Sequence, residues 1–449
     1  MVLWVLARFV LDPMALSHYR KLWPFYSLFG PVILSAVINT AYVNGSRIES
    51  AQYALSQALR LLVIGAVLVA SISFILAEPL ATYFKVGHLH YAYQGFSLYA
   101  FFALLGGFAE PLFVLTKRTS RLPRYTLFVT LGDVLAILLA FMWTKNLNQV
   151  VFWMILAQAV RLPILMSLYY RWKRELPVSD KRPFFERKAI LYLLSMAFIA
   201  FSGLGAVEIN RFIVGSQLDD FAFILYDLGA RKLPFITILT TSISSAIVAT
   251  YAHQVQQGRW MEVAQKVQAS TERLFRGLLP VLIVMALGAP SIVALVFGPL
   301  YREASQVFFW FTVALFSNMI FPQSILQASG RSWVIVSTSV AETLLNIILS
   351  LLLIIPLGIS GVAMAVAISH WIYTFILIVY CRHQFKLPVS TFFPRIPNVL
   401  FTVAIVVLAG LSYLVAYPLQ EIYGISDTVW ILPVLLAALG VAIYANKAN

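Results

Sequence analysis

Long apolar runs, separated by short polar segments, repeat along almost the whole chain. A run of about 18 or more apolar residues is long enough for a helix to cross the hydrocarbon core of a bilayer. The pattern predicts thirteen such spans, near 22–44, 59–84, 92–116, 122–143, 148–171, 189–214, 220–250, 274–298, 304–328, 332–355, 358–381, 397–417 and 428–445. The eleven residues that precede them, MVLWVLARFVL, would reach only about 16 Å as a helix and are expected to form a half-helix. The fold class is therefore predicted to be an all-α membrane protein.

The amino-acid composition is also typical of a protein that is surrounded by a lipid bilayer. The 449 residues are 61% hydrophobic and 11% charged, whereas a soluble domain has about 25% charged residues. Cys381 is the one cysteine, which excludes a disulfide framework and a cysteine metal cluster. The sequence contains no Walker loop, HExxH pair or nucleophile elbow. We therefore expect no cofactor, no metal and no catalytic residue.

The loops between the predicted spans alternate in charge. Basic loops occupy 117–124, 171–188, 256–276 and 381–395, and the loops between them are short and nearly neutral. The positive-inside rule places the basic loops, and with them the C-terminus, in the cytoplasm. The net charge of +14 is then explained mainly by these cytoplasmic loops. Attraction of the loops to anionic lipids is a second explanation. Nucleic acid is not an expected partner.

Two halves of the chain resemble each other at an offset of about 210 residues. ESAQYALSQALR (49–60) resembles EVAQKVQASTER (262–273), and Pro79 and Pro111 are 32 residues apart, as are Pro290 and Pro322. Asp133 then falls near Glu342. The offset spans six predicted helices, an even number, so the halves form a parallel repeat with a cavity expected between two lobes.

The repeat predicts the domain organisation. The N-terminal lobe is expected over 1–172, a basic cytoplasmic linker over 173–188, the C-terminal lobe over 189–384, and a linker with two additional helices over 385–449. RFVL (8–11) matches RFIV (211–214), so the first helix is expected to lack about twenty residues that its counterpart has. The native chain is then expected to begin upstream of Met1.

Ionisable residues inside the predicted spans are candidates for function. Each costs roughly 2.5–3.5 kcal/mol at mid-membrane, so it normally faces a cavity or a partner. Glu208 and Arg211 lie one helical turn apart, and Asp227 and Arg231 lie four residues apart on one face. Both pairs are predicted at a similar depth, in the outer half of the membrane, with Lys232 beside the second.

Arg161 lies about thirteen residues into its span, too deep for its side chain to reach the surface. Structural alternatives remain open for the other residues. Arg211 could reach the outer surface, and Asp227 with Arg231 could be a structural pair. Glu342 with Asn346 could only join neighbouring helices, and His370 is typical of a packed polar residue rather than a proton relay.

The chain resembles members of the multidrug/oligosaccharidyl-lipid/polysaccharide (MOP) exporter superfamily. Within it, the chain is most similar to the oligosaccharide-lipid flippases of O-antigen and capsule pathways. The resemblance is carried by EINRFIVG (208–215), LYDLGARKLP (225–234), VFGPLYREA (296–304), LQASGRS (326–332) and LIIPLGISGVAMAVAIS (353–369). The chain departs from the pattern in Glu208, where Asp is commoner, and in its half-absent first helix. Its two extra C-terminal helices are a feature that resembles lipid II flippases. Lipid II is therefore an alternative substrate.

The resemblance implies two six-helix lobes around a central cavity, as in multidrug exporters of this superfamily, exchanging access between the leaflets of the bacterial inner membrane. The implied cargo is an undecaprenyl-diphosphate-linked oligosaccharide for surface polysaccharide, O-antigen or lipopolysaccharide. The implied protein is a monomer in contact with membrane lipid and polysaccharide assembly proteins. An arginine- and lysine-lined cavity suits a diphosphate because it offers charge-assisted hydrogen bonds. The candidate cargo-binding residues are Arg161, Glu208, Arg211, Asp227, Arg231 and Lys232, and the candidate ion-coupling residues are Asp133, Glu208 and Asp227.

The source of energy and two other functions remain open in the sequence. Moving two negative charges outward releases about 4–5 kcal/mol per 100 mV of inside-negative potential, whereas the acids could instead bind protons or sodium. A cation-coupled drug or metabolite exporter of the same superfamily is the first alternative to a flippase. A polysaccharide polymerase or ligase is less consistent, because such enzymes need a large outer loop. The sequence favours a transporter over an enzyme.

Overall fold

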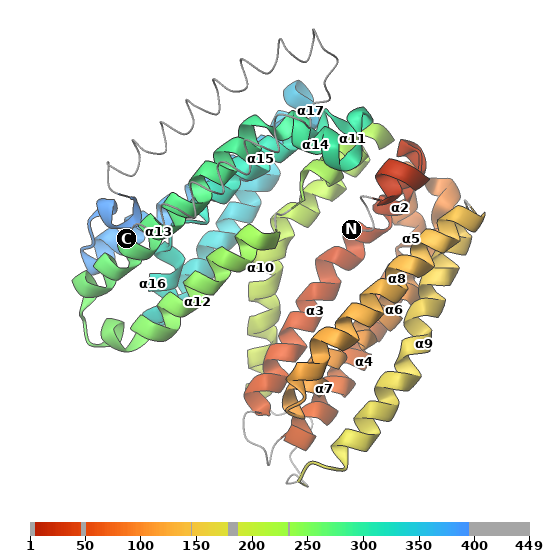
Figure 1. The fold of residues 1–449 in the computed structure, drawn as a ribbon, viewed down its shortest axis with the longest axis horizontal. Helices are drawn as coiled ribbons and strands as arrows, with labels where there is room; N and C mark the ends of the chain where they lie inside the picture. The colour runs from red at the N-terminus through yellow and green to blue at the C-terminus, as the bar shows by residue number, and fades with distance from the viewer. Residues whose placement is uncertain (1–4, 46–50, 145, 178–186, 232–233, 395–449) are drawn as a thin grey trace. The chain divides into compact units, whose positions relative to one another are not determined.

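The computed structural model describes residues 5–45, 51–144, 146–177, 187–231 and 234–394, and the regular structure in these ranges is entirely helical (Figure 1). Contacts divide the chain into two compact units, residues 1–224 and 225–449. The all-α class predicted from the sequence is confirmed.

The first unit begins with a π-helical turn, η1, and continues through a series of long helices. Its elements are η1 (Leu6–Val10), α2 (Pro13–Lys21), α3 (Trp23–Asn44), α4 (Ala51–Ile75), α5 (Ala77–Tyr83), η3 (Gly87–Leu89), α6 (His90–Gly106), α7 (Ala109–Leu115), η4 (Thr119–Arg121), α8 (Leu122–Thr144), α9 (Leu147–Lys173) and α10 (Arg187–Gln217). The next helix, α11 (Asp220–Gly229), crosses the boundary between the units.

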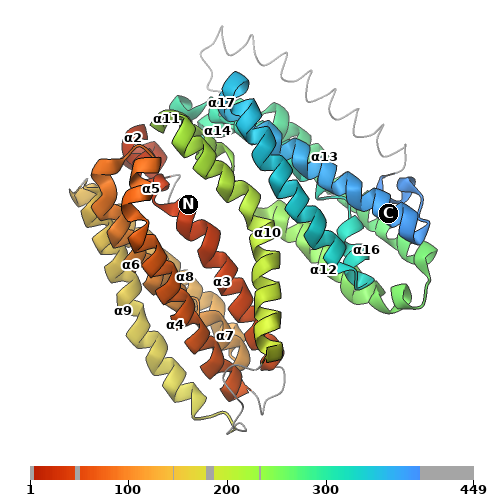
Figure 2. The ribbon, with the colours of Figure 1, turned by 180° about the vertical axis from the view of Figure 1, so that it is seen from behind.

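Helix contacts set the order of packing within the first unit. Helix α3 lies between α10 and α4, α6 lies between α4 and α9, and α8 packs on α9 (Figure 2). Buried side chains such as Leu62, Leu104, Phe108 and Leu112 form the core between these helices. Apolar side chains also cover the outside, including Phe128 and Trp143 on α8. Such an apolar exterior is expected of helices that are solvated by lipid.

The second unit has the same kinds of element. They are α12 (Pro234–Gln256), α13 (Trp260–Leu287), α14 (Ala289–Phe297), η5 (Pro299–Tyr301), α15 (Ala304–Ser317), α16 (Pro322–Ala328), α17 (Ser332–Phe385) and η6 (Val389–Phe392). Helices α15 and α16 pack on α17, and α12 packs on α16 and α13. The core between them includes Leu282, Ile325, Leu326, Leu377 and Cys381.

Bends and breaks interrupt several of the predicted spans. Within the described residues, six helical segments are long and apolar enough to cross a membrane, or up to eight if two bent pairs each form one span. The bent pairs are α13 with α14, at 77°, and α15 with α16, at 45°. The predicted span 220–250 is divided into α11 and α12. The predicted spans 397–417 and 428–445 lie outside the described residues.

The breaks in the helices recur in the same order in both units. Helix α4 is followed by the short α5, and α13 by the short α14. Lys85 and Lys117 have left-handed φ values of 58° and 59°, and Gly298 and Gly330 also have positive φ. Both of these pairs are 32 residues apart, which is the spacing of the proline pairs in the sequence repeat. Superposition of the two halves by rotation about the membrane normal stays a prediction.

Helix α17 consists of two limbs that fold back on each other. Pro356 and Gly358 interrupt it, and Gly358 has φ 56° and ψ −136°, outside the helical region. Asn346 on the first limb donates a hydrogen bond of 3.4 Å to the hydroxyl of Ser369 on the second. Gly361 passes close to the first limb, since a Cβ atom there would lie 2.2 Å from the carbonyl oxygen of Leu353. The turn therefore depends on glycine at both positions.

Alanine at Gly361 or Gly358 is expected to lower the stability of the second unit. Gly361→Ala forces the Leu353 carbonyl to move, and Gly358→Ala places a side chain in a sparsely allowed backbone region, at a cost of about 1–3 kcal/mol. Thermal unfolding in detergent measures the effect. Gly132→Ala on α8 is the matched control, because nothing lies within 4 Å of its added Cβ atom. Wild-type stability of Gly361→Ala would contradict the role given to this turn.

Candidate functional site

A cavity of about 670 Å³ lies within the first unit and combines apolar walls with a set of polar side chains. Helices α3, α7, α8 and α9 contribute these groups, and the backbone at the junction of α6 and α7 closes one wall. The polar lining consists of Ser35, Asn39, Tyr42, Glu110, Tyr125, Thr126, Thr130, Asp133 and Arg161. The Tyr42 hydroxyl donates a hydrogen bond of 2.9 Å to the Glu110 carboxylate. The cavity thus presents both charges and hydroxyls inside an apolar helix bundle.

Arg161 is the cation of this cavity, and two contacts set its position. On α9, its Nη1 lies 3.8 Å from Oδ2 of Asp133 on α8. Its Nη2 donates a long hydrogen bond of 3.5 Å to the carbonyl of Ala103 on α6. Gln158, one turn earlier on α9, hydrogen-bonds Asp133. The guanidinium retains capacity to bind, because its buried Nε has no hydrogen-bond partner among the described residues.

Gly106 makes the space that Arg161 occupies. A Cβ atom at Gly106 would lie 1.4 Å from Nη2 of Arg161. The end of α6 therefore has to be free of a side chain for the guanidinium to lie against its backbone. This close approach is a requirement for glycine that rests on packing rather than on backbone dihedral angles.

Glu208 and Arg211 form a buried ion pair within α10. The carboxylate Oε1 of Glu208 accepts a short hydrogen bond from Nη1 of Arg211, and the two side chains are 11% and 8% exposed. Helix α10 packs along α3 in the first unit. Arg211 is therefore held inside the protein, in contrast to the alternative in which it reaches the outer surface. A role in cargo binding stays a prediction.

Asp227 and Arg231 form a second local pair, at the end of α11 in the second unit. Arg231 donates from Nη2 to Oδ2 of Asp227 at 2.5 Å and from Nε to its carbonyl at 3.1 Å. Asp227 is fully buried, whereas the Arg231 side chain is 34% exposed. Lys232 lies outside the described residues. The expected arrangement of these pairs and Arg161 along one cargo path stays a prediction.

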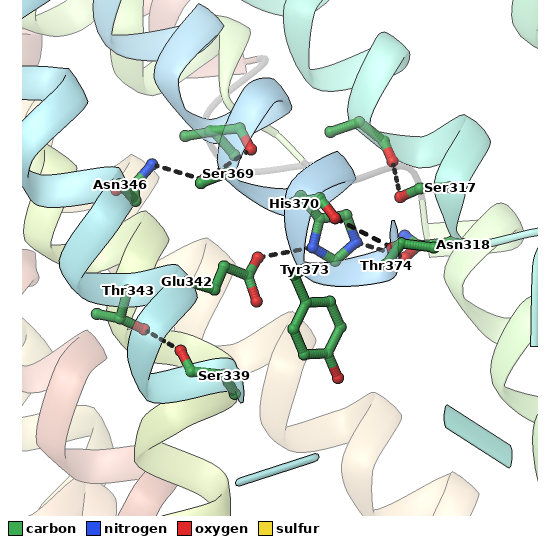
Figure 3. Close-up of polar contacts among 12 residues, drawn as sticks. Ser317, Asn318, Ser339, Glu342, Thr343, Asn346, Ser369, His370, Tyr373 and Thr374 are labelled. Atoms are coloured by element: carbon green, nitrogen blue, oxygen red, sulfur yellow. Dashed lines mark hydrogen bonds and ion pairs between the residues drawn. The ribbon is translucent and has the colours of Figure 1, made fainter. Parts of the chain in front are cut away.

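A further polar cluster lies in the second unit, around His370 on the second limb of α17 (Figure 3). Nδ1 of His370 is 2.7 Å from Oε1 of Glu342 on the first limb, and Nε2 is 3.0 Å from Oδ1 of Asn318. His370 and Asn318 also line a polar cavity of about 360 Å³. The sequence interpretation treated His370 as a packed residue and joined Glu342 to Asn346. The missed signal is the separation of 28 residues, which Glu342 and His370 share with Asp133 and Arg161.

The sequence reasoning also missed Lys21, which joins three segments of the first unit. Its Nζ lies 2.6 Å from Oδ1 of Asp220, at the start of α11, and donates a hydrogen bond of 2.9 Å to the carbonyl of Phe84. The Ser17 hydroxyl donates to the same Asp220 oxygen at 3.0 Å. The Lys21 side chain is 2% exposed. Because Asp220 lies in a segment interpreted as a nearly neutral loop, the pattern of the sequence did not indicate this contact.

The described residues contain no group of three or more His, Cys, Asp or Glu side chains that could hold a metal ion. The first cavity holds the paired guanidinium of Arg161 and a second acid, Glu110, among hydroxyl and amide groups. Such a site can bind an anion with planar or tetrahedral oxygens through charge-assisted hydrogen bonds.

Comparison with known proteins identifies the fold and the family. The structure is similar to that of the lipid II flippase MurJ in an inward closed conformation, with a TM-score of 0.68 at 13% identity, over 100% of this chain and 95% of that chain. It is also similar to two structures of a multidrug resistance MATE family transporter of the MOP superfamily. The inward-facing one has a TM-score of 0.64 at 12% identity, over 86% of this chain and 93% of that chain. The outward-facing one has a TM-score of 0.54 at 12% identity, over 83% and 86%.

At these identities the structural likeness shows the fold alone. Among curated protein sequences, none matches the chain. The family described as lipid II flippase MurJ matches residues 24–434, most of the sequence. The chain therefore belongs to the lipid II flippase MurJ family, a family of membrane transporters and not of enzymes.

Proposed function

We propose that this protein moves a polyprenyl-diphosphate-linked saccharide of the lipid II class across the bacterial inner membrane by alternating access. The observation that carries the proposal is the family match over residues 24–434. The first unit supports it with Arg161 beside a polar cavity of about 670 Å³. The lipid II alternative, which the two extra C-terminal helices kept open, is thus preferred over the O-antigen cargo that the sequence resemblance suggested.

Physical chemistry explains why such a cargo needs a protein. A sugar-diphosphate headgroup would lose its hydrogen bonds to water inside hydrocarbon, at a cost of several kcal/mol for each unsatisfied group. The guanidinium of Arg161 and the hydroxyls of Thr126, Thr130 and Tyr42 replace some of these bonds. The polyprenyl tail stays in the bilayer, so only the headgroup requires a polar route.

The family match favours a diphosphate-linked cargo over a cationic drug. In the cavity, Arg161 is paired with Asp133, and the second acid, Glu110, accepts a hydrogen bond from Tyr42. The paired acid serves release, because a cavity that holds an anion too tightly cannot let it leave. Asp133, Glu208 and Asp227 remain proposed ion-coupling residues, and Arg211, Arg231 and Lys232 remain proposed contacts of the cargo along its path.

Flipping of fluorescent lipid II in proteoliposomes tests the function. The fraction of label that a membrane-impermeant quencher reaches is followed with time in vesicles with and without the protein. An undecaprenyl-diphosphate O-antigen unit and a cationic drug are tested in parallel. Faster movement of lipid II than of the other two is expected. Preferential movement of the O-antigen unit or of the drug would contradict the proposed cargo.

Gly106→Ala is expected to reduce flipping while the protein stays folded. The added methyl group takes the place of Nη2 of Arg161 and displaces the guanidinium from the backbone of α6. Loss of one charge-assisted hydrogen bond, worth about 1.5–3 kcal/mol, corresponds to a decrease of roughly tenfold or more in cargo affinity. Gly132→Ala is the matched control, on α8 beside Asp133, with open space around the added atom. Equal flipping by the two variants would exclude this role for the Arg161 position.

A further inference from the structure

Two ion pairs occupy equivalent places in the two units. Asp133 and Arg161 are 28 residues apart on α8 and α9, and Glu342 and His370 are 28 residues apart on the two limbs of α17. The offset from the first pair to the second is 209 residues for both members, close to the offset of the sequence repeat. Each base also contacts the end of the helix that precedes the break: Arg161 reaches the Ala103 carbonyl, and His370 reaches Asn318.

The chemistry of the two pairs differs in one respect. An arginine guanidinium keeps its charge across the physiological pH range, whereas a histidine imidazole is a group that can bind or release a proton. The base of the first pair therefore offers a fixed positive charge, whereas the base of the second pair can exchange a proton during a cycle. Asp133 and Arg161 both line the cavity of the first unit, and His370 lines that of the second.

Both ring nitrogens of His370 have a hydrogen-bond partner, Nδ1 on Oε1 of Glu342 and Nε2 on the side-chain amide of Asn318. This arrangement can accommodate a doubly protonated ring. Both contacts are hydrogen bonds when the ring carries two N–H groups, that is, as imidazolium beside carboxylate. When the proton on Nε2 is released to the cavity, the lone pair of Nε2 faces a lone pair of Oδ1 on Asn318. The amide must then turn its NH₂ group to the ring or the contact must open, while Nδ1–H still donates to Glu342.

The surroundings favour a single exchangeable charge. His370 is 26% and Glu342 14% exposed at the side chain. Tyr373 stacks on the His370 ring with centroids 5.7 Å apart. The other described residues that line the cavity, from α12, α15 and α16, are hydroxyl, amide or apolar groups without charge. Glu342 and Tyr373 are thus the titratable groups that face His370 from the described elements.

Asn318 links this charge to the shape of the unit. It directly follows α15, at the break where the chain bends by 45° into α16. A change of the hydrogen bond between Asn318 and His370 therefore acts at a bend between two helices. Glu342 and His370 also connect the two limbs of α17.

We propose that His370, Glu342 and Asn318 form a proton-binding site in the second unit, and that its proton drives the flipping cycle whose cargo is bound in the first unit. The coupling rests on the proposed function, whereas proton binding itself does not. On this proposal, the two copies of the repeat have diverged. The first unit has a permanently charged arginine, Arg161, and the second has a histidine, His370, whose charge can change.

Difference titration of the cargo-free protein in detergent tests the site. Between about pH 5 and 9, the wild type is expected to bind about one more proton per chain than His370→Asn. Ser369→Ala is the matched control, since it removes a hydrogen bond between the limbs but no ionisable group. Identical titration curves for the wild type and His370→Asn would overturn the proton site, whatever the cargo.

A pH gradient at zero membrane potential tests the coupling. One pH unit is a tenfold ratio of proton activity, so the wild type with one proton per cargo is expected to shift the leaflet ratio of fluorescent lipid II by up to about tenfold. His370→Asn and Glu342→Gln are expected to flip downhill without this shift, and Ser369→Ala to keep it. Flipping by the wild type with no shift, or a shift that follows a sodium gradient instead, would overturn the coupling and leave the proposed function intact. Failure of the wild type to move lipid II would overturn the function, while the titration still decides on the proton site.

Discussion

Arg161→Ala is expected to reduce flipping at least about 100-fold, the largest effect on activity of any single change in the first cavity. The guanidinium can offer a diphosphate two parallel hydrogen bonds, each worth about 1.5–3 kcal/mol, and every 1.4 kcal/mol is a factor of about ten. Arg161→Lys should restore part of the activity, because it keeps the charge and loses the planar fork. Initial flipping rates in proteoliposomes at equal protein density measure both variants.

The acid beside Arg161 provides the control for this prediction. Removing Arg161 alone leaves Asp133 without its cation, so part of the loss could come from the fold. The double variant Arg161→Gln with Asp133→Asn removes both charges and should unfold near the wild-type temperature while flipping stays lost. Asp133→Asn alone should bind cargo more tightly and release it more slowly. Normal flipping by Arg161→Ala, or recovery in the neutral double variant, would contradict cargo binding at Arg161.

Lys21→Met is expected to cause the largest loss of stability. It leaves Asp220 without its closest cation and the Phe84 carbonyl without its donor. Removing one partner of a buried ion pair costs about 3–5 kcal/mol, and the lower end applies because Asp220 is 25% exposed and so partly screened. Folded yield and thermal unfolding in detergent are the measurements.

An exposed lysine at the same end of the first unit is the matched control. Lys85→Met removes an equal charge, but Lys85 is exposed and its one long contact is with the Gln217 carbonyl. It should change stability little. Lys21→Met combined with Asp220→Asn should recover part of the loss, because the unpaired carboxylate is gone. Equal stability of the Lys21 and Lys85 variants would show that the buried contact contributes nothing.

Local features of this protein could be predicted from the sequence, and contacts between distant segments could not. The all-α class and the apolar helices follow from runs of residues whose burial or contact with lipid is decided locally. The same holds for Glu208 with Arg211 and for Asp227 with Arg231, which are neighbours through the helical repeat alone. The apolar pattern is insensitive to bends, however, because a broken helix and a straight one can have equal hydropathy. It therefore joined α11 to α12 and merged α4 with α5.

The contacts that the sequence did not indicate require knowledge of which helices lie side by side. The Asp133–Arg161 and Glu342–His370 pairs depend on two adjacent helices meeting in the correct register. Lys21 and Asp220 are separated by almost the whole first unit. The space at Gly106 depends on the packing of α9 on α6. No local propensity contains this information.

The way in which the charges are paired has a consequence for how the chain enters the bilayer during synthesis. A lone ionisable group costs about 2.5–3.5 kcal/mol when a helix is inserted. Glu208 with Arg211 and Asp227 with Arg231 are each paired within a few residues, and the pairs around Arg161 and His370 each lie within one helical hairpin. Each of these charges can therefore enter the membrane together with its partner, before the rest of the chain is made. Lys21 is different, because Asp220 leaves the ribosome about 200 residues later. Lys21 can contact Phe84 early, but its carboxylate partner is present only after α11 has been made. The contacts at the end of α2, one of the earliest helices, are therefore among the last of the first unit to be completed.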